Sequence, residues 1–119
     1  MRRRRGEVWL VRFDPSVGAE MQKLRPAVVM NVAGLGRLPL VIVVPVTDWK
    51  PHYLGFAWFV NLPTSRANGL LKESGADAFQ VKSVSENRLV RRLGVLTDAQ
   101  LDAIAAAIAL LVGYTPPTP

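Results

Sequence analysis

The side chain that most clearly invites a chemical interpretation is Arg25, which stands directly before an apolar run in the segment KLRPAVVMN, residues 23–31. Pro26 suits the first position of a strand because it has no N–H to donate to a ladder, so the run predicts a buried strand. A guanidinium is always charged and is costly to bury without a partner. Arg25 therefore either points back to solvent, with Glu20 as the obvious ion-pair partner, or lies at the mouth of a site that binds an anion.

The other side chains narrow the chemistry that is available. The chain has no cysteine, which excludes a disulfide framework, a thiolate nucleophile and a cysteine-ligated metal. Its one histidine, His52, falls in a predicted loop, and no carboxylates cluster at ligand spacing, so we expect no metal site and no cofactor. Without a pair of histidines for an acid–base relay, any catalysis depends mainly on charge stabilisation and positioning.

Thr47 is a second candidate, because it closes the predicted third strand. Pro45 falls near the end of that strand and would remove one ladder bond, which predicts a strand edge or a bulge before Thr47. Strand ends of this kind often direct side chains into sites. Taken alone, the Thr47 hydroxyl could equally satisfy a local backbone group.

Strands are the main elements that must position these side chains. Apolar segments bounded by turn residues predict five strands, at residues 7–13, 25–32, 38–47, 55–62 and 76–85. Residues 86–96 are expected to form a short turn or a further strand. The fourth is apolar on both faces, which predicts that it is covered on both sides or partly buried by another subunit.

One helix is expected, over residues 98–112. Thr97 and Gln100 form a capping-box pattern, and Gly113 is a natural stop. Its core-facing stripe is predicted to be Leu101, Ile104, Ile108, Leu111 and Val112. Several strands followed by one helix predict an α+β fold, mainly β, in which a small antiparallel barrel carries a helix at one end.

Composition predicts a single globular domain of 119 residues, 50% hydrophobic and 20% charged. We expect a flexible basic arm at residues 1–5, the domain at 6–113, and a proline-rich disordered tail at 114–119. The net charge of +6 suggests a nucleic-acid partner, but residues 2–5 supply four of the fifteen cations, and the eleven others against nine acids leave only +2. The arm could hold phosphates or be a solvated end.

Neither secretion nor membrane insertion is indicated. The opening MRRRR resembles the start of a signal peptide, but Glu7, Arg12 and Asp14 interrupt any apolar region after it. The longest apolar run, residues 103–112, is about half the length that a membrane-spanning helix needs. We therefore expect a soluble, cytoplasmic protein without a membrane partner.

Three segments, taken in order, resemble the MazF/PemK-like toxins of bacterial toxin–antitoxin pairs: GEVWLVRFDPSVGAEMQKLRPAVVMN, VVPVT and FQVKSVSENRLVRRLGVL. The most specific part is the spaced series G-(E/D)-(V/I)-(W/Y), (F/L)-D-P-x-x-G-x-E and R-P-x-V-V, with Arg25 five residues after Glu20. The resemblance covers about Gly6 to Gly113. It implies an SH3-like barrel with a C-terminal helix, a homodimer, a MazE-like antitoxin as partner, and a metal-independent, sequence-selective endoribonuclease that cleaves single-stranded RNA (mRNA).

The resemblance also implies catalytic roles for three residues. Arg25 matches the catalytic arginine of the family, Thr47 the threonine that closes the third strand, and Glu20 an acidic residue beside them. Lys23, in the same loop as Glu20, is assigned to substrate binding. Trp49, in the loop after Thr47, is expected to be a platform on which a base stacks.

Further substrate-binding positions come from the family segment (D/E)-Q-(I/P)-R-T. Gln80, Lys82 and Ser83 match its glutamine, arginine and threonine, with two conservative changes; alone, the three would read as an exposed strand face. Phe79 stands where many members carry an acid. If residues 76–85 form one strand, Asp77 faces the same side as Phe79 and could replace that acid.

This set of residues suits cleavage of RNA through its own 2′-hydroxyl, which needs neither an enzyme nucleophile nor a metal. A fixed guanidinium at Arg25 stabilises the extra negative charge of the phosphorane with directed donors. Thr47 could donate to a nonbridging or leaving oxygen, and Glu20 or a water could take the 2′ proton. The expected products are a 2′,3′-cyclic phosphate and a 5′-hydroxyl.

Two other functions remain open at the level of the fold. The same fold is used by toxins that bind and inhibit DNA gyrase without hydrolysing anything, and SH3-like barrels are frequent peptide-binding modules. The pair of segments RPAVV and VVPVT favours the ribonuclease branch of the family.

Overall fold

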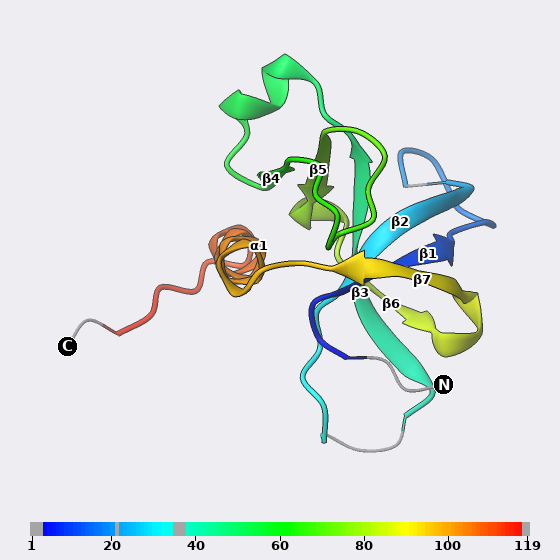
Figure 1. Ribbon diagram of the computed structural model, residues 1–119. Helices are drawn as coiled ribbons and strands as arrows, with labels where there is room; N and C mark the ends of the chain where they lie inside the picture. The colour runs from blue at the N-terminus through cyan, green and yellow to red at the C-terminus, as the bar shows by residue number, and fades with distance from the viewer. Residues whose placement is uncertain (1–3, 21, 35–37, 118–119) are drawn as a thin grey trace.

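An antiparallel sheet with one α-helix makes up the part of the chain that the computed structural model describes, residues 4–20, 22–34 and 38–117 (Figure 1). Three short 3-10 helices interrupt the loops. In chain order the elements are β1 (Glu7–Arg12), β2 (Leu24–Val29), β3 (Leu40–Asp48), η1 (Pro51–Gly55), β4 (Phe59–Leu62), β5 (Ser74–Asp77), η2 (Ala78–Gln80), β6 (Lys82–Ser85), η3 (Glu86–Arg88), β7 (Leu89–Val95) and α1 (Asp98–Leu111). The predicted α+β, mainly β class is confirmed.

Strand β3 is the centre of the sheet, whose order is β4-β5-β3-β2-β1-β7 with β6 also on β3. On one side β3 pairs with β2. On its other side, β6 pairs with residues 40–43 and β5 with residues 46–48. Pro45 lies between these two paired stretches, where β3 has no neighbour on that side. The strand edge predicted at Pro45 is therefore present, but it is confined to this short gap.

Both faces of the sheet are covered by apolar side chains. One core lies between the sheet and α1 and includes Val28, Val44, Val46, Leu101 and Ile104. The other lies within the curl of β1, β2, β3, β6 and β7 and includes Trp9, Val11, Phe13, Val43 and Leu89. Among the described residues β6 and β7 are joined by η3 without a ladder between them, so the small barrel is left open at that point.

Helix α1 begins as its sequence predicts. Thr97 Oγ1 accepts from the N–H of Gln100 at 3.1 Å, and Gln100 Oε1 accepts from the N–H of Thr97 at 2.9 Å, which completes the capping box. Leu101 and Ile104 are buried as expected. Val112 lies beyond the end of the helix and is 73% exposed, so its assignment to the core-facing stripe is wrong.

The predicted fourth strand, residues 55–62, is shorter in the structure. Only Phe59–Leu62 pairs, with β5, while the preceding residues turn back so that the N–H of Phe59 donates to the carbonyl of Phe56 at 3.1 Å. Aromatic rings contact each other instead of alternating across a strand: Tyr53 stacks on Phe59 at 3.9 Å between centroids. This ring cluster accounts for much of the hydrophobicity that predicted a two-faced strand.

The predicted fifth strand, residues 76–85, is divided into β5 and β6 by η2. Asp77 caps this 3-10 turn, because its Oδ1 accepts from the N–H of Phe79 at 3.1 Å. A side-chain acceptor of this kind offers the backbone an alternative to a strand ladder. Asp77 is 7% exposed and Phe79 is 64% exposed, so the expectation that they face the same side of one strand is wrong.

The predicted boundaries of the domain lie close to the ends of the described chain. Residues 1–3 of the expected basic arm, and residues 118–119 of the expected tail, lie outside the described residues. The N–H of Arg4 donates to Glu7 Oε1 at 2.9 Å. At the other end, the N–H of Tyr114 donates to the carbonyl of Ala109 at 2.9 Å. That the arm and the tail are flexible stays a prediction.

Candidate functional site

Arg25 lies in β2, opposite Val11 of β1, and is half-buried. Its Nε–H donates to the carbonyl of Gln22 at 3.1 Å. The expected ion pair with Glu20 does not form: Glu20 Oε2 lies 3.7 Å from Lys82 Nζ, and Glu20 Oε1 accepts from the N–H of Val17 at 2.8 Å. No carboxylate of the described residues therefore neutralises Arg25, and its two terminal nitrogens can receive an anion.

Thr47 faces the same region from the neighbouring strand. The β2–β3 ladder ends at the pair of Ala27 with Pro45, and Arg25 and Thr47 each lie two residues beyond that pair, so strand alternation directs both side chains to one face of the sheet. The structure thus brings together a guanidinium and a hydroxyl that are distant in the sequence.

Asp77 shares this face of the sheet. Thr47 pairs with Gly75 in β5, and Asp77 lies two residues beyond Gly75, so the alternation of a strand directs both side chains to one side. Burial raises the pKa of the Asp77 carboxyl, partly opposed by hydrogen bonds from the N–H of Phe79 and the amide of Gln80, whose Nε2 lies 3.3 Å from Asp77 Oδ2. Asp77 is thus less easily ionised than an exposed aspartate.

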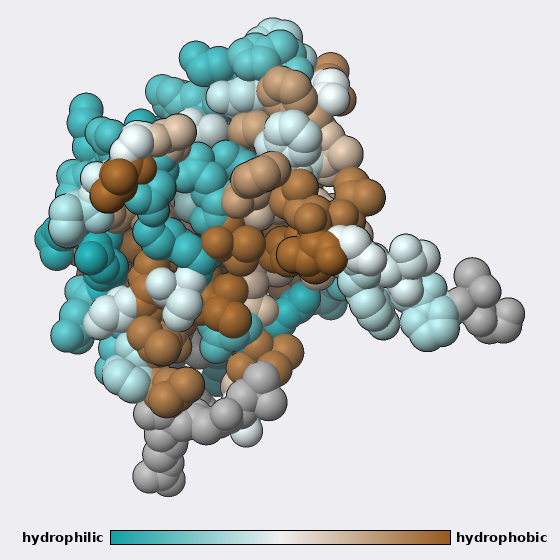
Figure 2. Space-filling model, turned by 180° about the vertical axis from the view of Figure 1, so that it is seen from behind, coloured by the Kyte–Doolittle hydropathy of each residue, from teal (hydrophilic) through white to brown (hydrophobic). Residues whose placement is uncertain are grey.

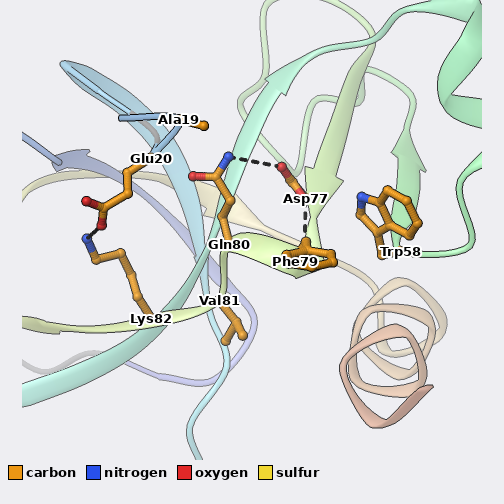
Figure 3. Close-up of a pocket in the computed structure, with 8 residues that line it drawn as sticks. All are labelled: Ala19, Glu20, Trp58, Asp77, Phe79, Gln80, Val81 and Lys82. Atoms are coloured by element: carbon orange, nitrogen blue, oxygen red, sulfur yellow. Dashed lines mark hydrogen bonds and ion pairs between the residues drawn. The ribbon is translucent and has the colours of Figure 1, made fainter. Parts of the chain in front are cut away.

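A groove of about 500 Å³ connects several of the predicted site residues (Figure 3). The Glu20–Lys82 ion pair lies at one side and Asp77 at the other, with Gln80 between them. Its lining consists of Ala19, Glu20, Trp58, Asp77, Phe79, Gln80, Val81 and Lys82. Four of the residues that the family resemblance assigned therefore border one cavity: Glu20, Asp77, Gln80 and Lys82.

Five predicted site residues are not among those that line the groove: Arg25, Thr47, Lys23, Trp49 and Ser83. Trp49 lies against Gly75, where an added Cβ would stand 3.0 Å from its ring, and its ring meets Tyr53 edge-on at 5.6 Å. Ser83 is exposed on β6 and borders a separate cavity of about 310 Å³. Lys23 is exposed directly before β2, with a left-handed φ of 67°.

Two aromatic residues of the groove were not predicted as site residues. Trp58 is half-buried, and its ring meets Phe79 edge-on at 5.6 Å. Phe79 was noted only for the acid that it replaces. In the sequence, Phe79 is a large apolar residue that stands between Ala78 and Gln80, close to Asp77. This pattern does not fit a single buried strand.

The residues that the structure describes include neither a cluster of potential metal ligands nor a long apolar helix. In that part of the chain, no group of three or more His, Cys, Asp or Glu side chains could hold a metal ion. Nor is any described helix long and apolar enough to cross a membrane.

The chain is similar to known proteins over almost its whole length. Residues 4–112 match the family model described as "PemK-like, MazF-like toxin of type II toxin-antitoxin system". Endoribonuclease MazF9 of Mycobacterium tuberculosis is 34% identical over 114 residues, which cover 90% of this chain and 93% of that protein. Endoribonuclease PemK of Escherichia coli is 33% identical over 90 residues, 73% of this chain and 68% of that protein.

Solved structures agree with this assignment. MazF from Deinococcus radiodurans superposes with a TM-score of 0.78 at 24% identity, covering 93% of this chain and 96% of that one. A second structure from the same organism, of MazE-MazF, superposes with a TM-score of 0.68 at 26% identity, covering 92% of this chain and 94% of the other. The predicted SH3-like fold is thereby confirmed, and the chain belongs to the family of PemK-like, MazF-like toxins of type II toxin-antitoxin systems.

Proposed function

We propose that this chain is the endoribonuclease toxin of a toxin–antitoxin pair and that it cleaves single-stranded RNA through the 2′-hydroxyl of the substrate, without a metal. One observation carries the proposal. The guanidinium of Arg25 has no acidic partner among the described residues and stands on the same sheet face as Thr47. Such an arrangement suits an anionic phosphate held at a strand end. The proposed substrate requires the protein to act in the cytoplasm.

In the proposed reaction the 2′-oxygen attacks the adjacent phosphorus and the bond from phosphorus to the 5′-oxygen breaks. The proton leaves the 2′-hydroxyl for Glu20 or a water, and the departing 5′-oxygen, to which the Thr47 hydroxyl can donate a hydrogen bond, receives its proton from water. The products are a 2′,3′-cyclic phosphate and a 5′-hydroxyl. Arg25 donates to the nonbridging oxygens, on which negative charge increases as the phosphorane forms.

Asp77 contributes to the same site without taking part in the bond changes. A carboxylate on the face that binds a phosphate would repel it. Because burial raises the pKa of Asp77 and two donors already occupy its oxygens, the repulsion that it exerts is limited. Its role is to position Gln80 and the backbone of Phe79 at the groove.

A cleavage assay on a long single-stranded RNA in the presence of EDTA tests the proposal. We expect cutting at a small set of sites, and each new end should carry a cyclic phosphate or a 5′-hydroxyl. A substrate with one 2′-deoxyribose at a cut site should resist there and nowhere else, because only that nucleophile is missing. Cleavage that stops in EDTA, or that proceeds at the deoxyribose, would refute the mechanism.

An antitoxin partner is proposed on the same grounds. Related proteins from Deinococcus radiodurans have been solved as MazE-MazF complexes. We expect an acidic, disordered segment of a MazE-like antitoxin to bind beside Arg25 and Lys82 and to fold on contact, covering the active residues. The peptide and the RNA should then compete; simultaneous tight binding of both would contradict this.

A homodimer is proposed as the assembly. Leu110, Val112 and Tyr114, in and after the last turn of α1, are exposed, and Figure 2 shows apolar residues gathered where the C-terminal tail begins. Burial of such a patch favours association. Sedimentation at micromolar concentration should give about twice the chain mass of 13.1 kDa; a persistent monomer would rule out the dimer.

A further inference from the structure

Phe79 presents an unusually exposed aromatic ring at the rim of the groove, with 64% of the residue accessible to solvent. The exposed part of this ring gains nothing for the fold, because its apolar surface is not removed from solvent. Its backbone is nevertheless fixed, since the N–H of Phe79 donates to Asp77 Oδ1 at 3.1 Å within a capped 3-10 turn. The ring is therefore held in place at the surface.

Two further rings, those of Trp58 and Phe56, pack in series against Phe79. The edge of Trp58 meets it with centroids 5.6 Å apart and planes at 72°. Trp58 in turn stacks on Phe56 at 4.8 Å with planes only 8° apart. Contacts of this kind restrict the rotation of each ring, so the platform exists before a ligand arrives.

Polar groups border the space beside this platform. Gln80 directs its amide nitrogen to Asp77 Oδ2, and the Glu20–Lys82 ion pair closes the opposite side (Figure 3). A groove of about 500 Å³ with one aromatic wall and a few polar groups has the size and composition of a site for a flat, polar-edged ligand.

We propose that Phe79 is the stacking platform for one unpaired nucleobase of the RNA substrate, with the edge of that base directed to Gln80 and to the Glu20–Lys82 pair. The proposal rests on the proposed ribonuclease function and adds to it a residue that determines which nucleotide is held beside the cut. Stacking on an aromatic ring is available to every base, whereas polar groups at the edge select among them.

Binding is measured with a single-stranded oligonucleotide that contains a cut site and carries 2′-O-methyl riboses throughout, so that it cannot be cleaved. Phe79→Ala should weaken binding roughly 5- to 150-fold, the range found for loss of one stacked base. Phe79→Tyr should bind like the parent, and Phe79→Leu, which keeps apolar volume without a π-face, should behave like Phe79→Ala. Leu71→Ala is the matched control, because Leu71 is 99% exposed and does not border the groove.

The base that stacks is located by replacing each nucleotide of the oligonucleotide in turn with an abasic one. At one position the abasic change should weaken binding to the parent protein but cause no further loss with Phe79→Ala, because both changes remove the same contact. If the effects of Phe79→Ala add to those of every abasic position, no base stacks on Phe79. Parent-like binding by Phe79→Ala or Phe79→Leu, or a parent protein that does not bind the oligonucleotide, would also overturn the proposal.

The cleavage assay separates this inference from the proposed function. If Phe79→Ala cuts unmodified RNA at the same sites with an unchanged KM, the platform is wrong while the ribonuclease function stands. If the parent protein binds the oligonucleotide through Phe79 but cuts no RNA, the ribonuclease function is wrong while the platform stands. If the site instead holds an aromatic side chain of an antitoxin, Phe79→Ala will weaken the antitoxin peptide and leave the oligonucleotide unaffected.

Discussion

Replacing Arg25 with alanine should separate the chemistry of this protein from its stability. In the folded chain the Arg25 guanidinium donates from Nε to the carbonyl of Gln22 at 3.1 Å, near the surface, and has no acidic partner among the described residues. Loss of such a bond costs about 0.5–1.5 kcal/mol of unfolding free energy. For a domain of this size that corresponds to a fall of roughly 2–8 °C in melting temperature.

The loss of activity should be far larger. In the proposed reaction the donors of Arg25 act mainly when charge has accumulated on the phosphorane, and removal of one such positioned donor costs about 3–4 kcal/mol, or roughly 10² to 10³ in rate. The decrease should appear in kcat and in kcat/KM together. Arg25→Lys should fall between, because an ammonium keeps the charge but not the two directed donors.

The assay is single-turnover cleavage of a defined oligoribonucleotide, run beside a thermal melt of each variant. Arg66→Ala is the control for charge, because Arg66 is an exposed loop arginine away from the groove and its loss should change neither rate nor melting temperature appreciably. The reasoning is refuted if Arg25→Ala cuts at the parent rate, or if it loses activity only because it unfolds.

Three further predictions concern the hydroxyl of the site and two buried polar groups. Thr47→Ala should lower the cleavage rate strongly while Thr47→Ser largely retains it; equal rates for both would assign the effect to packing. Burial alone would raise the pKa of Glu7, but hydrogen bonds from Arg4, Trp9 and Arg92 outweigh it and lower that pKa below the usual 4.5. The stability that the ionised Glu7 contributes should therefore be lost as the pH falls from about 4.5 through the lowered pKa. Glu7→Gln should flatten this part of a plot of melting temperature against pH, and parallel profiles would contradict the assignment. Asn68→Ala should lower the free energy of unfolding by about 3 kcal/mol or more in denaturant titrations. The reason is that Asn68 is 1% exposed and its side chain forms hydrogen bonds with the backbone of Pro63, Ser65 and Leu70. A cost below about 1 kcal/mol would show that water replaces these bonds.

Elements whose signals are local could be predicted from the sequence. The capping pair Thr97 and Gln100 defines the start of α1, and the apolar runs of β1, β2 and β3 lie within a few residues of their predicted bounds. The segment from Phe56 to Ser85 could not be predicted in the same way. There, rings contact one another and the Asp77 carboxylate binds a neighbouring N–H, and neither choice leaves a periodic pattern.

The candidate site shows the same division. The motif series pointed to Arg25 and Thr47 separately, but only the β2–β3 register places them on one face of the sheet. The partner of Glu20 is Lys82, sixty-two positions away, rather than the nearby Arg25 that sequence proximity suggested. In the sequence Phe79 reads as the loss of a family acid, and the platform role proposed for it depends on the turn that exposes it.

The order of the strands has a consequence for how such a toxin is made. Arg25, Thr47 and Asp77 come together only when β5 has joined β3, and β1 receives its second neighbour only from β7, which ends at Val95. A chain leaving the ribosome N-terminus first therefore cannot complete the sheet around the site until residue 95 has been made, roughly 5–19 s after initiation at 5–20 residues per second. During that interval the ribonuclease proposed here would be unable to cut the message that encodes it, and the antitoxin has the same interval in which to be present when the finished toxin is released.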